Sequence, residues 1–270
     1  MNAHKLPVCL TIAGLDPSGG AGILADIKTF GAFGCFGAAA VTSITYQNTV
    51  GVFGAENVSA ENVRRQAEPV FEDFTVAAVK TGMLPTREII EAVAEMIEKH
   101  RPAHFVVDPV VRSTSGFDLV DDEALAILCD MLLPLATVIT PNLSEAERIA
   151  GFAIESNDDR VRAIRKMREM GAANVLLKGG HAKGGAPPTK AIDVLFGGDS
   201  IEYFEAEFIE TTSTHGTGCT LAAGIAANLA LGHGLSSAIR AAKAFVTEAI
   251  RSAPGIGRGH GPVNHLIRNT

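Results

Sequence analysis

The chain alternates short apolar runs with amphipathic stretches about six times, and this alternation restricts its fold more than any other feature. Each apolar run is typical of a strand buried on both faces, and each following stretch has apolar residues at helical spacing. With short connections between them, these segments predict an α/β protein that has a mostly parallel central sheet with helices on both faces. The expected strands are residues 7–14, 37–45, 76–84, 104–111, 137–142 and 174–181.

Three further expectations concern the organisation of the chain. Residues 192–209 alternate around two glycines, which predicts a small β-hairpin. Ser144 is the expected N-cap of the helix after residue 142, and capping would account for one of the carboxylates of Glu145 and Glu147. No break in composition divides the sequence, so we expect a single domain over residues 1–270.

The composition excludes several classes of protein. A formal net charge of −7 argues against a surface that binds nucleic acid. The four cysteines form no CxxC pair and no zinc-ligand spacing, so a reducing cytoplasm is the simplest compartment. The first residues have no apolar signal-peptide core, and no apolar run reaches transmembrane length, so we expect no membrane partner.

Side chains able to bind ligands stand where predicted strands end or helices begin. The carboxyl ends of parallel strands share one edge of a sheet, and ligands bind at that edge. We therefore expect a single site built from Asp16, Gln47, Met83, Asp108, Asn142, Lys178 and Cys219.

The hydroxyl-rich stretch 211–220 leads into a long apolar helix pattern. Gly216 and Gly218 let the backbone approach a ligand closely, and free N–H groups at a helix start bind anions. Cys219 falls in the first turn, where a thiolate is favoured, so we expect its pKa to be lowered. A tight glycine turn with Cys219 as a core residue is an equally valid interpretation of this segment.

Together these side chains suit phosphoryl transfer, in which positioning and charge stabilisation supply most of the rate. Lys178 could neutralise a phosphate, or its ammonium could extend to solvent at a strand end. Asn142 and Glu145 could hold Mg²⁺ through waters. Gln47 and Asp26 could bind a polar ring, although a loop amide that bonds backbone groups and a solvated helical aspartate are the alternatives.

Six motifs, in the same order along the chain, closely resemble the hydroxymethylpyrimidine/phosphomethylpyrimidine kinases of thiamine biosynthesis, which belong to the ribokinase-like superfamily. The resemblance runs from about residue 10 to residue 263. The motifs are residues 14–22 (GLDPSGGAG), 47–49 (QNT), 80–84 (KTGML), 140–143 (TPNL), 177–181 (LKGGH) and 214–220 (THGTGCT).

The resemblance implies a ribokinase-like fold, the cofactors ATP and Mg²⁺, a pyrimidine substrate and a homodimer. It implies a pyrimidine pocket lined by Gly14, Asp26, Gln47, Met83 and Val110, and an anion hole formed by Gly216, Thr217 and Gly218. It also implies that Asp108, Asn142, Glu145 and Thr214 serve the ATP phosphates, with Lys178 beside them and the metal ion on Asp108 and Glu145.

Cys219 occupies the position at which ribokinase-like sugar kinases carry a catalytic aspartate. Kinases of this branch phosphorylate twice, first an alcohol and then a phosphate monoester. An alcohol is a very weak acid and benefits from a base, whereas a monoester is partly ionised at neutral pH. A thiol is therefore a workable compromise, and we expect Cys219→Ala to impair the first step much more than the second.

The chain departs from the family in one loop. Where the family often has a Lys-Ser-Gly-Asp run, this chain has Thr114-Ser115-Gly116-Phe117, so a lysine and an aspartate are missing. If that lysine holds the monophosphate, the second phosphorylation is weaker here unless Arg112 replaces it.

Three other functions compete with the pyrimidine kinase. A pyridoxal kinase would use a similar flat ring and hydroxymethyl group. A non-catalytic binding protein would need a degraded anion hole or a lost Cys219, and this chain has neither. A dinucleotide-binding oxidoreductase would need a G-x-G-x-x-G motif after the first strand, which the sequence lacks.

Overall fold

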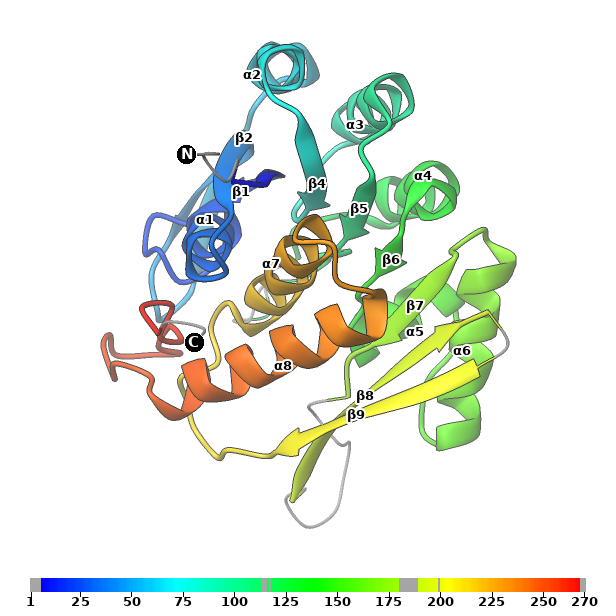
Figure 1. The fold of residues 1–270 in the computed structure, drawn as a ribbon. Helices are drawn as coiled ribbons and strands as arrows, with labels where there is room; N and C mark the ends of the chain where they lie inside the picture. The colour runs from blue at the N-terminus through cyan, green and yellow to red at the C-terminus, as the bar shows by residue number, and fades with distance from the viewer. Residues whose placement is uncertain (1–5, 113–115, 117, 180–188, 199, 268–270) are drawn as a thin grey trace, which may run out of the picture.

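The computed structural model describes residues 6–112, 116, 118–179, 189–198 and 200–267. These residues form one nine-stranded sheet in the order β3-β2-β1-β4-β5-β6-β7-β8-β9 (Figure 1). Strands β2, β1, β4, β5, β6 and β7 are parallel, and β3 and β8 pair antiparallel to their neighbours. The strands are β1 Val8–Leu15, β2 Phe36–Gln47, β3 Val52–Asn57, β4 Val76–Thr81, β5 His104–Val107, β6 Val138–Ile139, β7 Asn174–Leu177, β8 Lys190–Gly197 and β9 Ser200–Glu207.

The expected strands and hairpin are confirmed, with two differences. The hairpin β8–β9 extends the main sheet, because β8 pairs with β7. The edge strand β3 was not expected, since it lacks a continuous apolar run and Phe53 is 69% exposed. It exists because a tight turn, in which the N–H of Asn48 donates to the carbonyl of Gly51, folds it back onto β2. The loop that contains residues 114–117 lies largely outside the described residues.

Helices cover both faces of the sheet (Figure 1). Helices α2 to α6 pack on one face in a large apolar cluster, and α1, α7 and α8 pack on the other. Helix α7 is buried along most of its length, because small and apolar residues cover its whole circumference. The helices are α1 Gly22–Ala32, α2 Ala60–Asp73, α3 Arg87–His100, α4 Asp122–Leu132, α5 Leu143–Ala150, α6 Asn157–Glu169, α7 Thr217–Ala230 and α8 Leu235–Arg251, with a 3₁₀ turn at Leu133–Leu135.

The N-cap of α5 corrects one prediction. Asn142 caps the helix, not Ser144. Its Oδ1 accepts from the N–H of Glu145 at 2.9 Å, and the Glu145 carboxylate accepts from the N–H of Asn142 at 2.7 Å. This reciprocal pair is a capping box, which requires a side-chain acceptor three residues before a glutamate. Asn142 stands three residues before Glu145. Ser144 stands at the same spacing before Glu147, but it lies inside the helix, which begins at Leu143.

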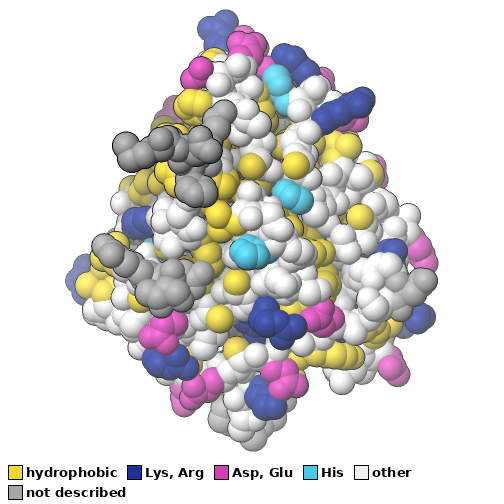
Figure 2. All heavy atoms as spheres, in the orientation of Figure 1, with side chains coloured by type: hydrophobic (Ala, Val, Ile, Leu, Met, Phe, Trp, Pro, Cys, Tyr) yellow, Lys and Arg dark blue, Asp and Glu magenta, His cyan; other side chains and the backbone are white. Residues whose placement is uncertain are grey.

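The outer surface shown in Figure 2 intersperses positive and negative side chains. Near α8 and β9, Arg240 pairs with Glu202 at 2.7 Å and Arg251 pairs with Glu207 at 2.9 Å. Within the described residues, no helix combines the length and the apolar character that a membrane crossing requires.

Candidate active site

The carboxyl ends of the parallel strands bring the expected phosphate-side residues together. Asp108 follows β5 and Lys178 follows β7, and Lys178 Nζ donates to Asp108 Oδ1 at 2.9 Å. Glu145 of α5 places Oε2 4.0 Å from the same ammonium. A Cβ on Gly218, in the first turn of α7, would lie 3.2 Å from Lys178 Nζ and 3.9 Å from Asp108 Oδ2. One cation, two carboxylates and the start of α7 therefore share one small volume.

The two carboxylates of this group differ in their electrostatics. Burial favours a raised pKa for Asp108, but Lys178, Lys80 and a hydrogen bond from Thr140 together hold that pKa below its ordinary value. Burial raises the pKa of Glu145 to about 7, because the attraction of Lys178 is partly offset by the charge of Asp108. Asp108 is thus the fixed anion of the site, and Glu145 is the carboxylate whose charge a nearby cation would most favour.

The loop before α7 has the shape of an anion site. Gly216 is the N-cap in the left-handed region (φ +83°), and a Cβ there would lie 1.8 Å from the carbonyl oxygen of Gly20. Only glycine fits this position. No side chain caps the helix, and Thr217 N–H and Oγ1 both donate to the carbonyl of Thr214. The positive end of the α7 dipole is therefore directed at the Lys178–Asp108 group.

A buried hydrogen bond fastens this loop to the glycine-rich loop after β1. His215 Nε2 donates to Asp16 Oδ2 at 2.7 Å, and Asp16 also accepts from the N–H groups of Ser18 and Ala21. Burial acts to raise the pKa of Asp16, but the bonds from His215 and Ser18 lower it overall. The two glycine-rich loops, about 200 residues apart in sequence, are thus held as one unit.

The environment of Cys219 contradicts the expected low pKa. Cys219 is half-buried in the first turn of α7. Burial raises the pKa of its thiol to about 11, and the nearby charges of Asp26 and Asp108 add to the increase. Lys80 and the N–H of Gly22 act in the opposite direction without prevailing. Desolvation and two carboxylates outweigh the helix N-terminus here.

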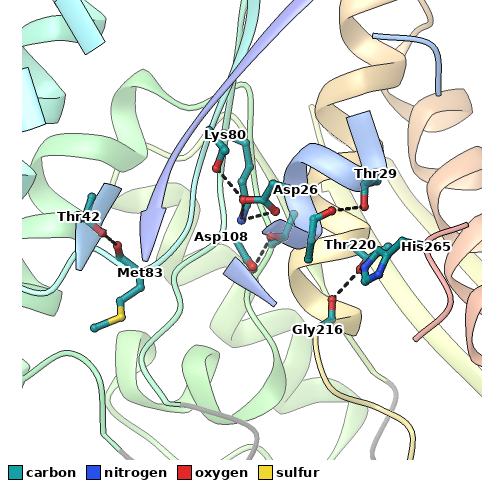
Figure 3. Close-up of polar contacts among 12 residues, drawn as sticks. Asp26, Thr29, Thr42, Lys80, Met83, Asp108, Gly216, Thr220 and His265 are labelled. Atoms are coloured by element: carbon teal, nitrogen blue, oxygen red, sulfur yellow. Dashed lines mark hydrogen bonds and ion pairs between the residues drawn. The ribbon is translucent and has the colours of Figure 1, made fainter. Parts of the chain in front are cut away.

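Asp26 makes a buried ion pair rather than facing solvent (Figure 3). Its two oxygens accept from Lys80 Nζ at 2.8 and 3.0 Å, and Oδ2 also accepts from Thr11 at 2.6 Å. Both Asp26 and Lys80 are 0% exposed. The carboxylate is therefore occupied by protein groups, and a direct contact with a ring would require it to move.

The remaining ring-side residues lie at the same edge of the sheet. A Cβ on Gly14 would lie 3.1 Å from Met83 Sδ, so these two residues are in direct proximity. Thr42 fixes the turn that carries Met83 by donating to its carbonyl at 2.7 Å (Figure 3). Gln47 ends β2 and Val110 follows Asp108, and both are half-buried.

Sequence reasoning missed three side chains that shape this site: Lys80, Thr140 and His215, which is the partner of the expected Asp16. A lysine inside the apolar run 76–84 was a usable signal, because a buried ammonium requires a buried carboxylate. The partners themselves could not be found from spacing, because Lys80 and Asp26 are 54 residues apart and Thr140 and Asp108 are 32 apart.

Comparisons with known proteins identify the family to which this chain belongs. The family model for phosphomethylpyrimidine kinase matches residues 16–264. A hydroxymethylpyrimidine/phosphomethylpyrimidine kinase of Rhizobium meliloti is 48% identical over 264 residues, which cover 97% of each chain. The chain spans about half the length of one curated bifunctional relative, a thiamine biosynthesis protein of Geobacter sulfurreducens.

Two solved structures share the fold. The phosphomethylpyrimidine kinase of Clostridium difficile superposes with a TM-score of 0.79 at 42% identity, covering 91% of this chain and 100% of that one. The pyridoxal kinase of Staphylococcus aureus in complex with ADP superposes with a TM-score of 0.88 at 34% identity, covering 97% and 94%. The family match, the full-length relative and the shared sheet together place this chain in the phosphomethylpyrimidine kinase family.

Proposed function

We propose that the protein is an ATP-dependent kinase of thiamine biosynthesis that phosphorylates 4-amino-5-hydroxymethyl-2-methylpyrimidine to its monophosphate and then to its diphosphate. The observation that carries this proposal is the group formed by Lys178, Asp108 and Gly218 at the start of α7. A transferring phosphoryl group needs a cation and a set of N–H donors on one side, and this group supplies both.

On the ring side, we propose that Gln47 reads the polar edge of the pyrimidine and that Met83, Gly14 and Val110 contact its faces. Gly14 leaves room there, since any Cβ would approach the Met83 sulfur. Asp26 contributes from beneath this pocket by fixing Lys80.

On the phosphate side, the N–H groups of Gly218 and Cys219 line the proposed anion hole. Thr214, Thr217 and Gly216 shape the loop that carries them, since both donors of Thr217 bond the carbonyl of Thr214. Lys178 balances the negative charge that collects on the phosphoryl oxygens. As the acceptor oxygen attacks phosphorus and the bond to the ADP oxygen breaks, the thiolate form of Cys219 accepts the proton of the alcohol and becomes the thiol. The dipole of α7 requires no reorganisation during this step.

Carboxylates are suitable ligands for Mg²⁺, which binds oxygen and keeps much of its water. Asp108 Oδ2 is near the proposed anion hole, and the raised pKa of Glu145 shows that its anion lacks sufficient positive charge nearby. The donor set therefore fits Mg²⁺ held on Asp108 and Glu145 through waters, with Asn142 positioning Glu145. When bound, the ion would neutralise charge on the nucleotide phosphates.

A pyridoxal kinase is the second candidate. The structural match to a pyridoxal kinase at a TM-score of 0.88 favours it. Both substrates present a flat ring and a hydroxymethyl group, so the same anion hole would serve either.

We also propose a homodimer in the cytoplasm. The resemblance to the family supports the dimer, and exposed apolar side chains on β2 and β3 support it as well, because monomers rarely leave large apolar patches uncovered. These side chains are Phe36, Ile44, Tyr46 and Phe53. All four cysteines are free, which suits a reducing compartment.

A product assay tests the proposed function. Purified protein is incubated with Mg-ATP and the pyrimidine alcohol, and the products are separated by charge over time, with pyridoxal in a parallel reaction. Monophosphate followed by diphosphate is the expected result. Monophosphate from pyridoxal alone would select the second candidate, and no product from either alcohol would refute both.

A further inference from the structure

The segment that follows α8 contacts both halves of the proposed site. We call residues 257–265 the C-terminal strap, the turn at 47–49 the ring-side loop, and residues 213–218 the phosphate-side loop. The strap begins at the ring-side loop and ends beside the phosphate-side loop. In Figure 1 this red segment lies next to α1.

At its first end, the strap binds Thr49. The N–H of Arg258 donates to Thr49 Oγ1 at 3.1 Å, and the N–H of Gly259 donates to the same oxygen at 3.3 Å. The N–H of His260 donates to the Thr49 carbonyl at 2.7 Å. Three consecutive backbone donors of the strap therefore converge on one threonine.

Glycines of the strap make this approach possible. A Cβ on Gly257 would lie 2.4 Å from Thr49 Oγ1, and a Cβ on Gly259 would lie 2.1 Å from the Thr49 carbonyl oxygen. Both distances are far inside van der Waals contact. Backbone thus packs against Thr49 at a separation that a side chain would prevent.

At its other end, the strap binds the phosphate-side loop and the first turns of α7. The N–H of His215 donates to the carbonyl of Gly261 at 3.1 Å, and His215 forms a parallel bridge with Pro262. His265 Nε2 lies 2.9 Å from Thr220 Oγ1, whose own proton goes to the Gly216 carbonyl at 2.8 Å (Figure 3). A hydroxyl has one proton to give, so His265 Nε2 is the donor.

The strap contacts both loops directly, whereas their other connection runs through the loop after β1, by the Asp16–His215 bond and by the bond from Thr45 Oγ1 to the carbonyl of Leu15 at 2.9 Å. Across the part of the chain that the structure describes, no hydrogen bond joins the ring-side loop directly to the phosphate-side loop. The strap is exposed at residues 257 and 258 and buried from 261 to 263. Its first end is therefore held by hydrogen bonds near solvent, and its second end is held by buried packing as well. Contacts of the first kind are the more readily lost.

We propose that the C-terminal strap fixes the distance between the ring-side and phosphate-side loops, and that Thr49 and His265 are positioning residues for phosphoryl transfer. This inference rests on the proposed function, in which the ring and the phosphoryl group occupy these two loops. Transfer requires the acceptor oxygen to stand in line with the phosphorus, and small displacements are costly.

Thr49→Val tests the proposal, because it removes the hydroxyl and retains the shape. Two hydrogen bonds to Oγ1 are lost, so we expect kcat for the first phosphorylation to fall and the KM for the pyrimidine to rise, each about threefold to tenfold. The KM for ATP should change less than about twofold. Thr49→Ser retains the hydroxyl and is expected to restore the wild-type KM. Tyr46→Phe is the matched control, because it removes a neighbouring hydroxyl that bonds Glu56 and not the strap.

Hydrogen exchange supplies a readout that needs no catalysis. In Thr49→Val, the N–H groups of residues 258–260 should exchange faster, and so should that of His215 at the far end of the strap. Gly259→Ala, which forces the strap away from Thr49, should give the same pattern. Unchanged exchange at His215 in both variants would overturn the proposal, as would equal rises in both KM values that Thr49→Ser fails to correct.

Failure of the proposed kinase function can be distinguished from failure of the proposed role of the strap. It appears as an absence of product from the wild-type protein, whereas the exchange experiment still decides whether the strap couples the two loops.

Discussion

At Cys219, two opposing effects determine what the side chain can do. The helix start and Lys80 favour a thiolate, and burial together with two carboxylates disfavours it. With a pKa of about 11, roughly one thiol in ten thousand is ionised at pH 7. The thiol therefore presents no standing negative charge to the phosphates, and only the small thiolate fraction, which has already lost its own proton, can accept the proton of the alcohol.

Cys219→Ala is expected to slow the first phosphorylation at least about tenfold, because general-base assistance to an alcohol is lost, and to slow the second less than about threefold. In the wild type, kcat/KM of the first step should rise with pH between 7 and 9, because the thiolate fraction grows about tenfold per unit below the pKa. Single-turnover assays of each step measure both effects. Equal losses in the two steps, or an alanine variant with the wild-type pH dependence, would refute the assignment.

Individual residues also mark the limit of sequence reasoning. The sequence placed Asp108, Lys178 and Gly218 at one edge of a sheet, and the structure brings them within contact distance. It could not reveal that Asp26 is bound to Lys80, because the pairing depends on how α1 packs over β4. Such long-range pairs follow from tertiary packing, which no local spacing encodes.

At the scale of elements, the start of α7 contains two glycines that are needed for different reasons, one for its backbone conformation and one for the space that it leaves. Gly216 is left-handed and touches the backbone of Gly20. Gly218 is helical, and a methyl group there would meet only the side-chain ends of Lys178 and Asp108.

The two alanine variants should therefore separate stability from activity. Gly216→Ala is expected to cost at least about 2 kcal/mol of stability through backbone strain and collision. Gly218→Ala should leave the melting temperature unchanged or higher, since alanine favours helix by up to about 1 kcal/mol, and should lower activity at least about tenfold by filling the proposed anion hole. Calorimetry and the product assay check both. A fully active Gly218→Ala enzyme would contradict the placement of the phosphoryl group.

The strap supplies a pH dependence of stability. Burial lowers the pKa of His265 to about 4, and the nearby charges of Lys28 and His215 act in the same direction. Between pH 4 and 6.5 the unfolded chain thus binds more protons than the folded one, so the free energy of unfolding falls as the pH falls. The histidine accounts for up to about 3 kcal/mol of this loss.

His265→Gln retains a donor for Thr220 without a titratable ring. We expect this variant to lose about 2 kcal/mol less stability than the wild type between pH 7 and pH 4.5, as measured by urea unfolding at both values. Equal losses in the two proteins would show that His265 is not responsible.

Elements differ in how far the sequence predicts them. Long apolar runs predicted the parallel strands, and the structure contains each of them. Strand β3 was not predicted, because an exposed edge strand shows no continuous apolar run in the sequence, and its pairing with β2 depends on the turn between them. The cap of α5 was misplaced by two residues because asparagine and serine both suit that role.

At the scale of the molecule, the strand order explains why one site draws on the whole chain. Strand β1 lies between β2 and β4, so residues from the first 50 positions reach the edge that β5, β6 and β7 complete. The alternation of strands and helices predicted this parallel sheet. It did not predict that β8 and β9 extend the sheet beyond β7, because a hairpin pattern in the sequence is the same whether the hairpin joins the main sheet or stands apart from it.

Light scattering tests the proposed homodimer. We expect a particle of about twice the 28.2 kDa chain mass. Phe53→Glu places a charge on the exposed apolar face of β3 and is expected to weaken association, while Glu61→Gln, on the surface of α2, serves as control. A wild-type particle of single-chain mass at assay concentration would refute the dimer.

The order of the segments along the chain has a consequence for biosynthesis. The C-terminal strap follows every described strand and helix, so the ribosome makes it after both loops that it joins. A nascent chain can therefore pair its sheet and form the start of α7 before the contacts of the strap exist. On the proposed role of the strap, the alignment of the two loops is completed last, and an incomplete chain that ends at α8 would have the fold without that alignment.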